Sequence, residues 1–311
     1  MAAAAEPLAS WAEGQTKQSI IDFVSDVSTE GSPNYVRPPE RIAVFDNDGT
    51  LWVEQPLYVT ILFAVDRVKV LAPEHPEWNE KVPFASMLKG NLRAALSRGE
   101  KSLIELVIGT HSGVTNAEFA TIASEWIASA IHPTTKRPIK EMVYQPMLEL
   151  LAYLRSNGFK NYVVSGGMVE FMRVWMEELY GIPPEQVIGS SLEMELVMRD
   201  GKQELMRLPK LLSFNNENAK PINISRHIGR RPIAAFGNSD GDLQMLQWTT
   251  DGEGARFGLF VRHTDADREW SYDRKSSIGK LNKGLDEAEV RGWTVVDMKR
   301  DWKRIFPREK E

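Results

Sequence analysis

The sequence predicts an α/β fold: a doubly wound parallel sheet that carries an inserted helical domain and a β-hairpin. Between residues 141 and 311, short apolar runs alternate with amphipathic helical patterns. This alternation is typical of parallel strands connected by helices that cover both faces of a sheet. Residues 56–140 contain helical patterns but no convincing strand. We therefore expect a core domain formed by residues 1–55 and 141–311, and a helical domain formed by residues 56–140.

The N-terminal elements follow from periodicity and from residues that break helices. Residues 18–27 have apolar side chains at helical spacing, and the Pro- and Gly-rich segment 31–40 ends that helix. A buried strand is predicted at 42–45. In the inserted region, two helical faces are indicated by Leu57, Ile61, Val65 and Val68, and by Phe119, Ile122, Trp126 and Ile127.

The C-terminal elements alternate between helix and strand. The Asp200-Gly201 pair lies between two alternating runs, which predicts a β-hairpin over 192–208. The helix over 145–158 ends at Gly158. The other predicted elements are helices at 169–181 and 219–229, and strands at 161–167, 185–191, 232–237, 256–263 and 292–298.

Composition excludes several classes of protein. The 311 residues are 42% hydrophobic and carry a net charge of −5, without a basic stripe that would favour nucleic acid as a partner. No apolar run approaches the roughly 18–20 residues of a membrane span. The absence of cysteine excludes disulfides, thiolate nucleophiles and cysteine zinc sites.

The opening MAAAAEPLAS lacks the basic and apolar regions of an intact signal peptide. A start rich in small residues fits a mature exported protein, so we expect a periplasmic or exported location. A cytoplasmic protein with a disordered N-terminus is the alternative.

Polar residues follow three predicted strands. Asp46 and Asp48 come after the strand at 42–45, Ser165 ends the strand NYVV, and Asn238 to Asp240 follow the strand PIAAFG. Ligands bind at the carboxyl ends of strands in parallel sheets, so these residues predict a site. An isolated Asp-x-Asp-Gly is usually a turn. The additional polar residues at neighbouring strand ends favour function over a turn alone.

This group of residues suits phosphoryl transfer. An aspartate can attack a phosphoryl group only when positive charge offsets the repulsion between two anions, and Mg²⁺ bound by carboxylates supplies such charge. The aspartate would form an aspartyl-phosphate, and a second carboxylate would protonate the leaving alkoxide and then deprotonate water.

The sequence resembles the haloacid dehalogenase superfamily of phosphohydrolases, closest in style to its phosphoserine phosphatase-like branch. The matching motifs are VFDNDGTLW, VVSGG, ENAKP and FGNSDGDLQML, in the order of the family, from about residue 41 to 246. The resemblance implies a Rossmann-like core and a cap domain in the inserted helical region, which closes over the site and reads the leaving group.

The resemblance assigns roles to individual residues. Asp46 matches the nucleophile and Asp48 the general acid/base, and both would hold Mg²⁺. Ser165 and the backbone of Gly166 match the groups that bind the phosphoryl oxygens. Lys220 matches the charge-neutralising lysine, with Lys210 as a rival.

The fourth motif departs from the family pattern, because Asn238 stands where relatives usually have aspartate. Asn238 would bind the metal through its amide oxygen and Asp242 would support it, or Asp240 would be the direct ligand. All three remain candidate metal ligands. Glu54 and Gln55, which follow the first motif, are candidate substrate-binding residues, with a solvated helix start as the alternative.

The expected function is hydrolysis of a small phosphorylated metabolite by a Mg²⁺-dependent phosphatase, without nucleic acid or membrane as a partner. A dehalogenase with the same fold is one alternative, although its chemistry needs neither an acid at Asp48 nor Mg²⁺. A catalytically silent phosphate-binding protein is another, motivated by Asn238. The sequence fixes neither the substrate nor the oligomeric state.

Overall fold

The computed structural model describes residues 7–307, so the first six residues of the Ala-rich start, on which the expected export rests, lie outside it. The strands of the described part are β1 (Ile42–Phe45), β2 (Lys160–Met168), β3 (Val187–Arg199), β4 (Lys202–Ser213), β5 (Ala234–Gly237), β6 (Phe257–Thr264), β7 (Ser271–Tyr272) and β8 (Thr294–Asp297). The longer helices are α1 (Gln15–Ser28), α2 (Val59–Leu71), α5 (Glu100–His111), α6 (Asn116–Ser129), α7 (Gln145–Ser156), α10 (Ala219–Ile228), α11 (Leu243–Thr250) and α12 (Lys283–Arg291). The short helices are α3 (Phe84–Leu88), α4 (Leu92–Ala95), α8 (Val169–Arg173), α9 (Met176–Tyr180) and α13 (Met298–Asp301).

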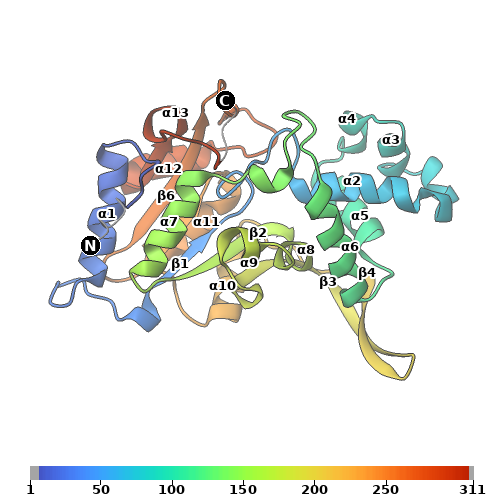
Figure 1. Cartoon of the computed structure of the whole chain (residues 1–311), viewed down its shortest axis with the longest axis horizontal. Coiled ribbons are helices and arrows are strands. Elements are labelled where there is room, and N and C mark those ends of the chain that lie inside the picture. Colours follow the sequence, from blue (N-terminus) through green and yellow to red (C-terminus); the bar gives the residue numbers. More distant parts are fainter. Residues whose placement is uncertain (1–6, 308–311) are drawn as a thin grey trace.

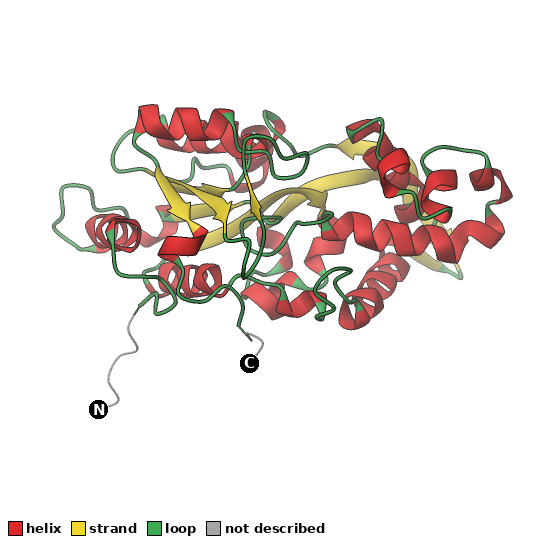
Figure 2. Cartoon of the chain, turned by 90° about the horizontal axis from the view of Figure 1, so that it is seen from above, coloured by secondary structure: helices red, strands yellow, loops and turns green. Residues whose placement is uncertain are grey.

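One mostly parallel sheet lies between two layers of helices (Figures 1 and 2). The strand order is β4-β3-β2-β1-β5-β6-β7, and β8 also pairs with β6. Pairing is parallel from β3 through β2, β1 and β5 to β6 and β8, whereas β4 and β7 are antiparallel to their neighbours. The predicted α/β class with a doubly wound sheet is confirmed.

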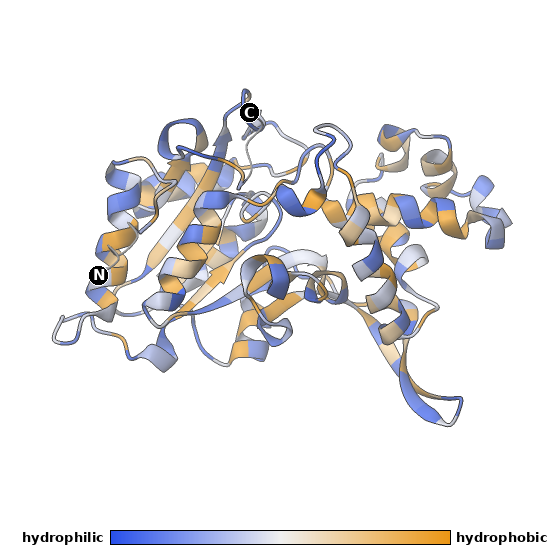
Figure 3. Ribbon diagram, in the orientation of Figure 1, coloured by the Kyte–Doolittle hydropathy of each residue, from blue (hydrophilic) through white to orange (hydrophobic). Residues whose placement is uncertain are grey.

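The central strands are hydrophobic along their length (Figure 3), as expected for a sheet with helices on both faces. In β1, Ala43 and Phe45 pack in one core cluster with residues of α1 and α7. Ile42 and Val44 point to the other face and pack with residues of α10, α11 and α12. The fully buried β1 therefore holds the loop that begins at Asp46 rigidly at the end of the sheet.

The inserted helical region lies at one end of the sheet, on the right in Figure 1. It contains helices α2 to α6 and has a small core of its own around Val68, Trp78, Phe84, Met87 and Leu106. The β3–β4 hairpin extends from the sheet to this region, where β4 contacts α5 and α6. None of the described helices has the length and apolar character needed to cross a membrane.

Two predicted elements differ from the structure. The helix expected over 169–181 is two short helices, α8 and α9, interrupted before Met176. At the interruption, the buried Trp175 stacks on Trp52, with ring centroids 4.2 Å apart. The strand expected over 185–191 and the first arm of the hairpin form one continuous strand, β3.

Candidate active site

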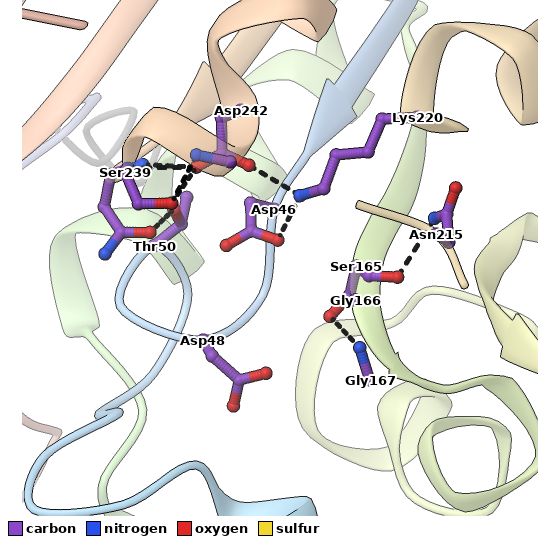
Figure 4. Close-up of polar contacts among 12 residues, drawn as sticks. Asp46, Asp48, Thr50, Ser165, Gly166, Gly167, Asn215, Lys220, Ser239 and Asp242 are labelled. Carbon is purple, nitrogen blue, oxygen red and sulfur yellow. Dashed lines mark hydrogen bonds and ion pairs between the residues drawn. The ribbon is translucent and has the colours of Figure 1, made fainter. Parts of the chain in front are cut away.

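Three adjacent strands bring the predicted residues to one edge of the sheet (Figure 4). Asp46 directly follows β1, Asn238 directly follows β5, and Ser165 lies in β2, where the pairing with β3 becomes irregular between Val164 and Met168. β1 pairs with β2 on one side and with β5 on the other. This is the position at which open parallel sheets bind ligands.

The loop after β1 turns back on itself around Gly49. The backbone of Gly49 has φ +77°, and a Cβ at this position would lie 2.0 Å from Nδ2 of Asn238. Both the conformation and the close approach therefore require glycine. Trp52 at the end of the turn donates from Nε1 to Oδ1 of Asp48, at 2.9 Å, which orients that carboxylate.

One buried lysine bridges two carboxylates. Nζ of Lys220 donates to Oδ1 of Asp46 at 2.6 Å and to Oδ1 of Asp242 at 2.5 Å. Burial acts to lower the pKa of Lys220, but the two carboxylates outweigh it and raise that pKa above its ordinary value. Lys220 is therefore a fixed positive charge beside Asp46. Lys210, its rival, forms a 2.7 Å ion pair with Glu193 and is 70% exposed.

The site contains more carboxyl groups than the single positive charge of Lys220 can balance. Burial, followed by repulsion from Asp242, raises the pKa of Asp46 to about 8, although Lys220 acts in the opposite direction. Burial likewise raises the pKa of Asp48 to about 6 and that of Glu54 well above its ordinary value. A cation bound beside these carboxyls would favour their ionised form.

The segment around Ser165 is held by a network that the sequence analysis missed. Oγ of Ser165 accepts from the backbone N–H of Gly167 at 3.0 Å. Nδ2 of Asn215 donates to the carbonyl of Ser165 at 3.0 Å, and Oγ of Ser190 donates to the carbonyl of Gly166 at 2.7 Å. The signal for Asn215 was its place in the polar run NNEN, which overlaps the start of the third motif.

The fourth-motif residues have separate roles in the structure. Oδ2 of Asp242 accepts from the backbone N–H groups of Asn238 and Ser239, each at 3.0 Å. Oδ1 of Asp240 instead accepts from the N–H groups of Asn282 and Gly284 at the start of α12, each at 2.9 Å. The structure therefore does not bring the carboxylate of Asp240 together with Asp46 and Lys220.

Glu54 and Gln55 have different surroundings. Oε1 of Glu54 accepts from Nδ2 of Asn238 at 2.6 Å and from the hydroxyl of Tyr272 at 2.8 Å. Glu54 also lines the cavity described below, whereas Gln55 does not and donates to the carbonyl of Ile278 at 3.2 Å. Tyr272 comes from the short strand β7, which no sequence pattern indicated.

A cavity of about 840 Å³ opens at this edge of the sheet. One end is polar, with Asp46, Asp48, Ser165 and Lys220 among its lining residues. The remaining wall is supplied largely by the inserted helical region. This volume lies within the roughly 300–1,000 Å³ of small-molecule sites.

The donors available for a metal are oxygen atoms. Within residues 7–307 there is no group of three or more His, Asp or Glu placed to hold a metal ion. Both carboxylate oxygens of Asp242 accept hydrogen bonds, and Oδ1 of Asp240 accepts from the start of α12. Asp46 and Asp48 line the cavity, and Oδ1 of Asn238 accepts from the hydroxyl of Thr50 at 3.2 Å, so these three residues are the better candidates for a metal. Two carboxylates, one amide oxygen and water suit Mg²⁺, which keeps several waters when bound to proteins. The residues therefore fit this metal.

Comparisons with known proteins agree with this architecture. A search of curated protein sequences found no match. A conserved protein of unknown function from Anaerococcus prevotii matches with a TM-score of 0.57 and 16% identity, covering 89% of this chain and 90% of that one. A protein of unknown function from Bordetella pertussis matches with a TM-score of 0.51 and 15% identity, covering 83% and 99%. These likenesses show a shared fold.

The family model described as haloacid dehalogenase-like hydrolase matches residues 43–247. The match covers more than half of the 311 residues and includes Asp46, Ser165, Lys220 and Asn238. The chain therefore belongs to the haloacid dehalogenase-like hydrolases.

Proposed function

We propose that this protein is a Mg²⁺-dependent phosphatase, of the phosphoserine phosphatase-like branch, that hydrolyses an organic phosphomonoester. The observation that carries the proposal is the pairing of Asp46 with the buried Lys220 at the polar end of the cavity. A carboxylate held beside a fixed cation suits nucleophilic attack on an anionic phosphoryl group.

In the first step, a carboxylate oxygen of Asp46 forms a bond to phosphorus while the bond to the leaving oxygen breaks. Asp48 gives its proton to that oxygen, and the alcohol departs. In the second step, Asp48 takes a proton from water, whose oxygen bonds to phosphorus and releases Asp46 and inorganic phosphate.

The phosphoryl oxygens need donors in both steps. Ser165 and Gly166 line the cavity, and the network of Asn215 and Ser190 fixes their backbone in place. Asp46, Asp48 and Asn238 would hold Mg²⁺, which when bound supplies positive charge between the nucleophile and the phosphoryl group. The orientation of the amide of Asn238 is fixed by Glu54, which accepts from Nδ2, and by Thr50, which donates to Oδ1.

Phosphate release from a panel of phosphomonoesters, in Mg²⁺ and in excess EDTA, tests the proposal. We expect release in Mg²⁺ and its loss in EDTA, because two anions repel each other without a cation between them. Full activity in EDTA would rule out the proposed metal dependence.

The substitution Asp46→Asn tests the nucleophile. It should leave the circular dichroism spectrum unchanged and remove turnover, because an amide is not an effective nucleophile. Turnover by pure Asp46→Asn protein would assign the attack to another group.

A further inference from the structure

The cavity wall contributed by the inserted helical region is mostly apolar. It includes side chains from the segment before α2, from α2 itself and from α5, among them Leu57, Ile61, Leu62, Leu103, Ile104 and Val107. The polar groups proposed for phosphoryl transfer come from the edge of the sheet, from the loop after β1, from β2 and from the start of α10. The cavity is therefore divided into a polar end and an apolar end.

Formal charges are scarce on this apolar wall. Of the described residues of 56–140 that line the cavity, Arg93 and Glu100 are the charged ones, and both are exposed. The other polar side chains of this wall are the hydroxyl groups of Tyr58, Thr60 and Ser97. A leaving group with an ammonium, a carboxylate or several hydroxyls would therefore lose water against a wall that offers it few partners. Each unpaired polar group would cost binding.

From this division we infer that the substrate is a phosphomonoester of an apolar alcohol or phenol, whose hydrocarbon part lies against the cavity wall formed by residues of α2 and α5. The inference rests on the proposed phosphatase function and names its substrate class. The volume of about 840 Å³ leaves most of the cavity to the leaving group, since the phosphoryl group occupies only the polar end. Burial of hydrocarbon then supplies the selectivity.

A series of n-alkyl phosphates from ethyl to octyl tests the inference through kcat/KM in Mg²⁺. We expect kcat/KM to rise about two- to fourfold for each added methylene, which is the gain that burial of a methylene gives. Phosphoserine and a sugar phosphate should be turned over less well than octyl phosphate. A flat or falling series would overturn the inference and leave the phosphatase function standing. No turnover of any phosphomonoester would overturn both.

Two substitutions in α5 locate the effect. Ile104 lines the cavity, whereas Ile108, one turn along the same helix, is half-buried against the core and does not line it. Ile104→Gln should lower the ratio of kcat/KM for octyl to that for ethyl phosphate at least about fivefold, and Ile108→Gln should leave it unchanged. Equal ratios in wild type and Ile104→Gln would exclude this wall from the binding of the leaving group.

Discussion

The amide of Asn238 sits between an acceptor and a hydroxyl, and its hydrogen bonds depend on its being an amide. Nδ2 donates to Glu54 at 2.6 Å, while Oδ1 accepts from the hydroxyl of Thr50 at 3.2 Å. Aspartate at this position would place a second carboxyl oxygen against Glu54. Asparagine at position 238 therefore matches the buried carboxyl of Glu54, because its amide supplies a donor to that carboxyl. The hydroxyl of Tyr272 also donates to Glu54.

We expect Asn238→Asp to lower the unfolding free energy in EDTA by about 1–3 kcal/mol, because a neutral amide is replaced by a second carboxyl beside the buried Glu54, where a negative charge is unfavourable. Adding Glu54→Gln returns an amide donor to the pair and should recover most of the loss. Urea unfolding of the two single variants, the double variant and wild type measures the coupling. Additive effects of the two substitutions would show that the residues do not interact.

The same substitution should lower the Mg²⁺ concentration that gives half-maximal activity, because a carboxylate is a harder anionic ligand than an amide. Asn238→Ala should raise that concentration without unfolding the protein. Activity titrated against Mg²⁺ for the three proteins measures both shifts. If neither variant moves the midpoint, Asn238 is not a metal ligand.

At this scale, prediction from the sequence was best where residues lie at strand ends. Asp46, Ser165 and Asn238 could be grouped because parallel strands end at one edge. Asn215 and Tyr272 could not, since they come from a loop and a two-residue strand without periodicity. The sequence pattern also could not predict the direction of the Asp240 side chain, because that direction depends on where the later helix α12 begins.

Among the elements, the β3–β4 hairpin connects the sheet to the inserted helical region. Arg207 of β4 is buried there, donates from Nε to the carbonyl of His111 at 2.6 Å and lies over the ring of Phe119. Its guanidinium also pairs with Glu170 of α8, at 3.2 Å. The alternating pattern predicted the hairpin. The pattern did not predict that the hairpin would contact the inserted helical region through a buried arginine, because a charge is buried only where other elements supply partners for it.

We expect Arg207→Ala to lower the unfolding free energy by about 3–5 kcal/mol, since it leaves Glu170 buried without its partner. Arg199→Ala on the same hairpin is the matched control. Arg199 pairs with Glu118 at 2.8 Å, but both side chains are more than 40% exposed, so the loss should be at most about 1 kcal/mol. Equal losses for the two variants in urea unfolding would contradict a special role for Arg207.

The stability of the whole molecule should depend on pH through buried groups that act in opposite directions. Burial raises the pKa of Asp46, Asp48 and Glu54 in the folded state, so these carboxyls stabilise the metal-free protein at low pH and less as pH rises. His111 acts in the other direction. Burial, reinforced by the charges of Arg207 and Arg67, lowers its pKa well below 6.5 in the folded state.

The folded protein therefore holds His111 neutral, packed edge-on to Phe63 with ring centroids 5.2 Å apart. In the unfolded chain the imidazole binds a proton below about pH 6.5, so the unfolded state gains stability as the pH falls through that value. The contribution of His111 is largest above pH 6.5 and declines by up to about 1.4 kcal/mol for each pH unit below it.

His111→Gln, which does not titrate, should be less stable at pH 8, with a deficit that shrinks toward pH 5. Urea unfolding of both proteins in EDTA from pH 8 to 5 measures the difference, in which the shared carboxyl contributions cancel. A deficit that stays constant over this range would mean that His111 is protonated equally in the folded and unfolded states.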